Sequence, residues 1–188
     1  MENPISYLAE DAHRTLRAAK QAECDGRVND EASFSRSAVV LYFVTLRGLV
    51  NAVYEWSGVP NHEWRNLATH TRWTQAVQLC LPRLEQPGEA LQFPRDHIGD
   101  DLPLLSRFLE LRDAVNDEPC GAIPADPTES PDAEVATAAD VYPRTGFPRR
   151  QSEYRLEHAE SAATIYQDMV ARLDLCFRGK TRVLTTPV

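Results

Sequence analysis

Apolar residues recur along most of this chain at spacings of three and four, the period of an α-helix rather than of a strand. The pattern is clear from the start, at Ile5, Leu8, Ala12, Leu16 and Ala19. It predicts five helices, which cover residues 5–24, 31–56, 65–84, a stretch that begins near Asp101, and 152–178. The sequence shows no internal repeat and no credible pair of strands. We therefore expect an all-α fold, a four- to five-helix bundle in a single domain, 1–188.

The second predicted helix is apolar on nearly every side. Between Ala38 and Tyr54, thirteen of seventeen residues are apolar, and the exceptions are Thr45, Arg47, Gly48 and Asn51. A strand is the alternative for so aliphatic a run, but its length and the lack of internal turn residues favour a helix. A helix of this kind must be covered all round. We expect it at the centre of the fold or in the interface of a homodimer.

The segment 116–151 breaks the helical pattern. Six prolines exclude a long helix there, at positions 119, 124, 127, 131, 143 and 148. Carboxylates collect in the same region, with eight between Asp113 and Pro143 and no lysine or arginine. They account for the whole net charge of −8, since the other 20 acidic residues of the chain are matched by 20 basic ones. We expect a long acidic, proline-rich loop beside a neutral helical body.

Composition excludes several classes of protein. The four cysteines stand at least 40 residues apart, so they cannot form a zinc knuckle, and we expect reduced thiols in a cytoplasmic protein. No run of 18 apolar residues occurs, so we expect neither a membrane span nor a membrane partner. Potential metal ligands collect before the fourth helix, at Asp96, His97, Asp100 and Asp101. Helix capping explains these aspartates better than a metal does, and we expect no metal site.

The fourth predicted helix carries an arginine within its apolar stripe. On a helical wheel of about 100° per residue, Arg112 falls between Phe108 and Leu105. A guanidinium in that place is unfavourable unless it is paired or lines a polar cleft. One interpretation is a structural arginine that is bridged to a carboxylate on a neighbouring helix. The other is a functional cation.

The residues around Arg112 suggest a family. Residues 109–117, LELRDAVND, are similar to the signature helix of the HEPN superfamily. In that helix an Arg-Asn pair is followed a few residues on by histidine. The long HEPN helix, with its small-residue start, resembles residues 34–51, from FSRSA to TLRGLVN. The order of elements agrees, with a Trp-bearing helix before the signature helix and an alanine-rich helix at the end. The resemblance covers most of residues 5–178 and implies a dimer that pairs its signature helices.

The resemblance also implies a chemistry, from which this chain departs. In catalytic HEPN proteins, the arginine and histidine of two subunits meet across a dimer interface and cleave RNA without a metal or other cofactor. Arg112 matches the arginine, whereas Asp113 stands where asparagine is usual, and Asn116 or Asp117 stands where histidine is required. The motif is therefore degenerate. Because it lacks a group that exchanges protons near neutral pH, we expect ribonuclease activity to be absent or severely weakened.

Two polar residues of the second helix bear on the same site. Arg47 and Asn51 lie four residues apart and so share a face. In the family the first of these positions is commonly an acid that can face the signature arginine. A second arginine near Arg112 would instead attract a phosphate or carboxylate ligand. The alternative is that Arg47 pairs with a carboxylate of its own chain, such as Glu110 or Asp113.

Three functions follow from these observations. The first is a homodimeric HEPN-like protein, descended from ribonucleases of toxin or defence systems, that binds RNA, a nucleotide or a partner protein. The second is an active metal-free endoribonuclease that uses Arg112 with partners from elsewhere in the chain. The third is a purely structural dimerisation module whose buried arginines fix the register. RNA cleavage distinguishes the second from the others, and salt-dependent RNA binding distinguishes the first from the third.

Overall fold

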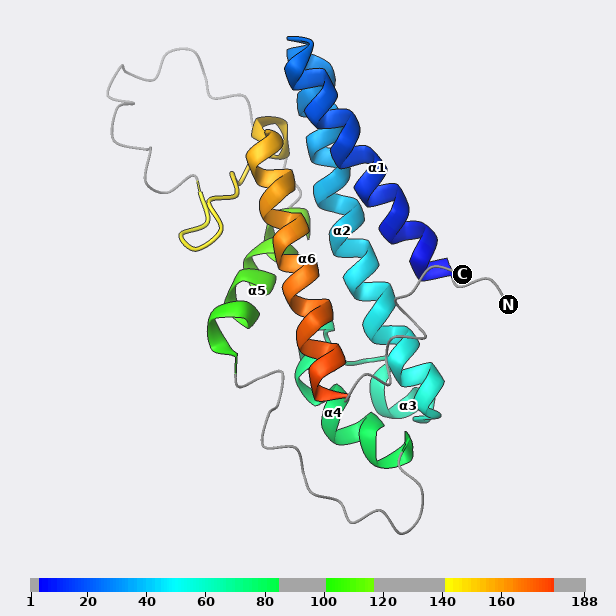
Figure 1. The fold of residues 1–188 in the computed structure, drawn as a ribbon. Coiled ribbons are helices and arrows are strands. Elements are labelled where there is room, and N and C mark those ends of the chain that lie inside the picture. The colour runs from blue at the N-terminus through cyan, green and yellow to red at the C-terminus, as the bar shows by residue number, and fades with distance from the viewer. Residues whose placement is uncertain (1–3, 85–100, 117–140, 178–188) are drawn as a thin grey trace.

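Helices make up 82% of the residues that the structure describes. The computed structural model describes residues 4–84, 101–116 and 141–177. Within these ranges the α-helices are α1 (Pro4–Cys24), α2 (Val28–Ser57), α3 (Asn61–Trp64), α4 (Thr69–Leu84), α5 (Leu102–Asn116) and α6 (Leu156–Cys176) (Figure 1). A 3-10 turn, η3 (Gln151–Glu153), precedes α6. The described residues form no strand beyond one isolated bridge, which confirms the all-α class.

The apolar helix α2 lies in the middle of the structure. α1 and α6 run alongside it, and α4 and α5 also pack against it (Figure 1). Several of its large side chains are fully buried, at Tyr42, Leu46, Leu49 and Tyr54. α2 begins at Val28, earlier than predicted, and ends where Gly58 takes the left-handed conformation, with φ of 72°. By length and composition α2 could cross a membrane, but 56% of its apolar window is buried inside the protein.

The predicted helix 65–84 is shorter than expected. Residues 65–68 form a turn between α3 and α4 instead of a helical segment. In this turn the backbone carbonyls of Arg65 and Leu67 accept hydrogen bonds from the guanidinium of Arg72, at 2.8 and 2.9 Å. Carbonyls that are satisfied by a side chain do not need an intrahelical partner, so the helix can start after them.

Part of the predicted loop 116–151 is ordered and packs on the helices. Residues 141–148 fold back on themselves through an antiparallel bridge, with a turn at Gly146, whose φ is 71°. The ring of Phe147 in this segment is fully buried. Burial of an aromatic ring explains why this portion is ordered although its prolines exclude a helix. Residues 117–140, which hold most of the predicted acidic loop, lie outside the described residues.

The three cysteines among the described residues form no disulfide. Cys80 and Cys176 are buried, and Cys24 is exposed. Burial raises the pKa of Cys80 to about 11, so this side chain stays a protonated thiol at neutral pH. The fourth cysteine, Cys120, lies outside the described residues.

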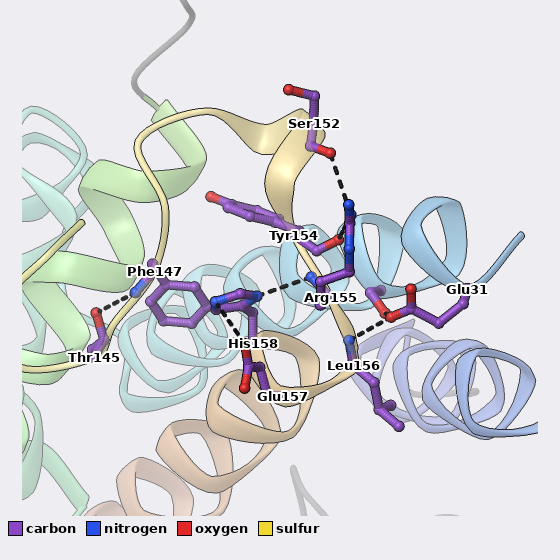
Figure 2. Close-up of polar contacts among 10 residues, drawn as sticks. Glu31, Thr145, Phe147, Ser152, Tyr154, Arg155, Leu156, Glu157 and His158 are labelled. Atoms are coloured by element: carbon purple, nitrogen blue, oxygen red, sulfur yellow. Dashed lines mark hydrogen bonds and ion pairs between the residues drawn. The ribbon is translucent and has the colours of Figure 1, made fainter. Parts of the chain in front are cut away.

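The first residue of α6 donates a hydrogen bond to a carboxylate that is distant in the sequence. Figure 2 shows Glu31 of α2 beside the first residue of α6, where the Leu156 N–H donates to Glu31 Oε1 at 2.5 Å. The Ser35 hydroxyl donates to the same oxygen at 3.0 Å. The Arg155 N–H donates to Nδ1 of His158 at 2.9 Å, and burial lowers the pKa of that imidazole, which keeps Nδ1 free to accept. These contacts set the start of α6, which is later than the apolar pattern predicted.

Replacing Glu31 with alanine is expected to lower the free energy of unfolding by about 1–3 kcal/mol, because the Leu156 N–H would be left without its acceptor. Glu31 is only 6% exposed, so water cannot readily take its place. Urea denaturation followed by circular dichroism measures the change. Glu157→Ala is the matched control, since that side chain is 79% exposed and its loss should stay within about 0.5 kcal/mol. Equal losses for the two variants would contradict this role of Glu31.

Candidate functional site

α5 presents Arg112 from a well-anchored helix. Asp101 caps α5 as predicted, since its carboxylate accepts a hydrogen bond from the Leu104 N–H at 3.1 Å. The apolar stripe of α5 is buried, at Leu104, Phe108, Leu111 and Ala114. Phe108 packs against Phe43 of α2 and Trp73 of α4, with ring centroids 6.3 and 6.0 Å apart. This packing fixes the rotation of α5 and turns Arg112 toward α4.

The guanidinium of Arg112 is held by two side chains. Its Nε donates to Asp113 Oδ1 at 2.7 Å, and its Nη2 lies 2.5 Å from the same oxygen. Its Nη1 donates to Nδ1 of His70 at 2.9 Å. The arginine is therefore paired, but the carboxylate is the next residue of its own helix and not one on a neighbouring helix. The side chain of Arg112 keeps 26% of its surface exposed, so the pair remains open to solvent.

His70 is the residue that sequence reasoning missed. It lies in the first turn of α4, 42 residues before Arg112. A guanidinium can only donate, so Nδ1 must accept, and the ring proton sits on Nε2, which is 3.3 Å from the Thr71 hydroxyl. The motif contains no histidine, yet the fold brings an imidazole to its arginine from another helix. Only the packing of α4 against α5 identifies this neighbour.

Arg72, two residues after His70, is a structural arginine. Besides the two carbonyls of the turn before α4, its guanidinium binds Asn51 Oδ1 through Nη1 at 2.6 Å. It also lies over the ring of Trp64, with Cζ 5.4 Å from the centroid. Asn51, predicted as a ligand-binding residue, thus receives its hydrogen bond from within the chain. Its amide ties α2 to α4.

Arg47 differs from the other two arginines. Its side chain is exposed, and among the described residues it forms no ion pair. Of the carboxylates suggested as partners for Arg47, neither Glu110 nor Asp113 forms an ion pair with it. Glu110 accepts instead from the backbone N–H groups of Arg144 and Thr145, and Asp113 pairs with Arg112.

The charge of Arg47 is felt by Arg72. The pKa of Arg72 is lowered first by burial and then by the positive charge of Arg47. α4 thus carries one neighbour of each predicted cation, because His70 contacts Arg112 and the charge of Arg47 acts on Arg72. We call Arg47, His70, Arg112 and Asp113 the arginine surface.

The rest of the predicted motif is only partly described. Asn116 is the last residue of α5, is exposed, and lies four residues after Arg112, so the two share a face of the helix. Asp117 lies outside the described residues. Within the described ranges, no group of three or more His, Cys, Asp or Glu side chains is placed to hold a metal ion. The described chemistry of the arginine surface is thus that of cations, one imidazole and one carboxylate.

Alanine substitutions should distinguish Arg72, which stabilises the fold, from Arg47, which forms no ion pair among the described residues. Arg72→Ala is expected to destabilise the protein by about 2–3 kcal/mol, because it removes three hydrogen bonds and leaves two turn carbonyls unpaired. Arg47→Ala should change the free energy of unfolding by less than about 0.5 kcal/mol, since no ion pair is lost. Urea denaturation of both variants tests the assignment. A large loss for Arg47→Ala would mean that Arg47 holds the fold together.

Comparisons with known proteins leave the site to be judged on its own contacts. No protein-family model, no characterised protein and no solved structure matches this chain. The similarity to the HEPN superfamily therefore rests on the residues of the two helices that carry it.

Proposed function

We propose that this chain is a HEPN-like helical bundle that acts as a homodimer and binds the phosphodiester backbone of RNA at the arginine surface. The observation that carries the proposal is the contact of Arg112 with His70, whose Nη1 and Nδ1 atoms are 2.9 Å apart. Arg47 supplies a second, exposed cation, and its charge acts on Arg72 of the same helix α4. A nucleotide presents the same phosphate chemistry. Descent from ribonucleases of toxin or defence systems, and a further partner protein, belong to the same proposal.

The charges of the site favour an anionic ligand. A guanidinium binds phosphate oxygens through paired N–H groups, and a second cation raises the local concentration of polyanions. The acidic residues that give the protein its net charge are concentrated between 113 and 143, so the helical body itself is neutral. Local charge, more than the global value of −8, then decides what this surface attracts, and the acidic run that starts at Asp113, directly after Arg112, opposes a phosphate there.

Asp113 limits the affinity of the free protein. Its carboxylate occupies the Nε and Nη2 side of the Arg112 guanidinium, which is where a phosphate would bind. An incoming phosphate must displace that carboxylate or bind beside it, against its charge. We therefore infer moderate affinity that depends strongly on salt.

A second copy of the chain would cover what α2 leaves open. Val44 of α2 is 38% exposed, although the helix is apolar and largely buried around it. Val44 lies three residues before Arg47, on the same side of α2. A homodimer formed through this side would bring the arginine surfaces of two subunits near each other.

RNA binding measured across a salt series tests the function. We expect the logarithm of the binding constant to fall linearly with the logarithm of salt concentration. Arg47→Ala and Arg112→Ala should weaken binding, whereas Asp113→Asn should strengthen it about fivefold, because the competing carboxylate is gone. Arg14→Ala is the control, since its 62% exposed side chain pairs with Glu10 on the outer face of α1. Absence of binding at low salt, or equal affinity for all variants, would leave the structural dimer.

The position of His70 favours one further candidate, a metal-free endoribonuclease. In such a reaction a base takes the proton from a 2′-hydroxyl, the resulting oxygen attacks the adjacent phosphorus, and the 5′-oxygen leaves with a proton supplied by an acid. The products are a 2′,3′-cyclic phosphate and a 5′-hydroxyl. His70 is the imidazole next to Arg112, and the guanidinium would stabilise the phosphorane charge.

Digestion of RNA in the presence of a chelator separates the two functions. We expect the wild type to leave RNA intact, because Asp113 occupies Arg112 and Arg112 occupies Nδ1 of His70. Asp113→Asn removes the competing negative charge, so that a phosphate can draw the guanidinium away from Nδ1 of His70, and this variant should show slow cleavage to cyclic phosphate ends. Adding His70→Ala to that variant should abolish the cleavage. Rapid cleavage by the wild type would make the ribonuclease the primary function, and an inactive Asp113→Asn variant would exclude it.

A further inference from the structure

We propose that Tyr154 and Gln151 are positioning residues that hold the last turn of α5 and thereby keep Arg112 against His70. The inference rests on the proposed function, because it assigns what aligns the arginine surface. It concerns the face of α5 that points away from that surface. The residues involved were part of no motif in the sequence.

The last carbonyls of α5 accept hydrogen bonds from residues outside the helix. The final carbonyls of a helix have no partner within it and must be satisfied by other groups. In α5 the Ala114 carbonyl accepts from the Tyr154 hydroxyl at 2.7 Å, and the Val115 carbonyl accepts from Gln151 Nε2 at 3.1 Å. The donors come from positions 40 and 36 residues later in the chain. The last turn of α5 is thus fastened by the segment that leads into α6.

Tyr154 can hold that turn because its own position is fixed. Its side chain is fully buried, and its ring packs against Phe147 and His158, with centroids 6.0 Å away in each case. Figure 2 shows the three rings gathered where the segment 145–158 meets α6. A hydroxyl on a ring confined in this way has little freedom to follow a moving helix.

A third contact grips α5 one turn earlier. Both oxygens of Glu110 face the 141–150 segment, and Oε2 accepts from the N–H groups of Arg144 and Thr145 at 3.0 and 2.8 Å. Glu110 and Ala114 are four residues apart, so these contacts lie on one face of α5. Arg112 lies about 200° around the helix from Glu110, on the opposite face. The hydrogen bonds made by Glu110, Tyr154 and Gln151, which we call the clamp, hold α5 from one side. Arg112 contacts His70 on the other side.

This arrangement makes the contact between Arg112 and His70 sensitive to rotation of α5. A side-chain atom roughly 6 Å from the helix axis moves by about 2 Å when the last turn rotates by about 20°. A movement of that size breaks a hydrogen bond of 2.9 Å. Loss of the clamp would therefore release His70 even if the helix stayed folded.

Tyr154→Phe tests the inference, because it removes the hydroxyl and keeps the ring. The first measurement is the nitrogen chemical shifts of the His70 imidazole, assigned by their loss in His70→Gln. In the wild type they should show one tautomer, with the proton on Nε2, and in Tyr154→Phe they should move toward the average of both tautomers. The second measurement is RNA affinity at low salt, which should fall about threefold to tenfold.

Tyr42→Phe is the matched control. Tyr42 is also fully buried. Its hydroxyl also forms one side-chain hydrogen bond, with His13 Nδ1 at 2.8 Å, but this bond joins α2 to α1. Its loss should disturb stability to a similar extent, and it should leave the His70 shifts unchanged. A purely structural role for Tyr154 would make the two variants behave alike.

The outcomes are distinct. Unchanged His70 shifts in folded Tyr154→Phe overturn the inference, whatever happens to RNA affinity. If that variant fails to fold, Gln151→Ala, which removes only the bond to Val115, takes its place with the same criterion. Altered His70 shifts in a protein whose wild type binds no RNA would support the positioning role and refute the proposed function.

Discussion

The need to cover α2 on every side organises this protein. Between residues 38 and 54 this helix has only four positions that are not apolar, so most of its surface must be buried, and the free energy gained by that burial supports the core. α1 and α6 run alongside it, and α4 and α5 complete much of the cover. Each of these helices carries its own apolar stripe, and α2 is the element that all of them share. The positions of the functional side chains follow from that arrangement.

The arginine surface forms where polar residues, rather than apolar ones, meet α2. Arg72 enters the fold only because the turn between α3 and α4 offers it two carbonyls and Asn51 offers its amide oxygen. A guanidinium with three such hydrogen bonds can be partly buried without a carboxylate partner. Its neighbours His70 and Arg47 are carried along by the same two helices. Structural necessity in α2 and α4 thus sets the place where a cationic site can arise.

Helix ends in this fold depend on side chains that are distant in sequence. The first N–H of α6 is satisfied by Glu31 from α2, and the last carbonyls of α5 are satisfied by Gln151 and Tyr154. A local cap would have made each helix independent of the others. Caps from elsewhere couple the ends of α5 and α6 to the packing of the core. The geometry around Arg112 therefore depends on residues that never touch it.

The sequence by itself determined most of the helices, their apolar faces and the place of Arg112 within the apolar stripe of α5. Apolar spacing is a local property, and it located α1, α2 and the buried stripe of α5, because a helix repeats its faces every few residues. Proline positions predicted no long helix between α5 and α6 for an equally local reason. The tertiary structure decided the rest: that His70 contacts Arg112, that Asn51 accepts a hydrogen bond from Arg72, and that α6 starts at Leu156, whose N–H donates to Glu31. Each of these contacts joins side chains from different elements. Which faces of two helices meet depends on how the whole core packs, and no period along the chain records it.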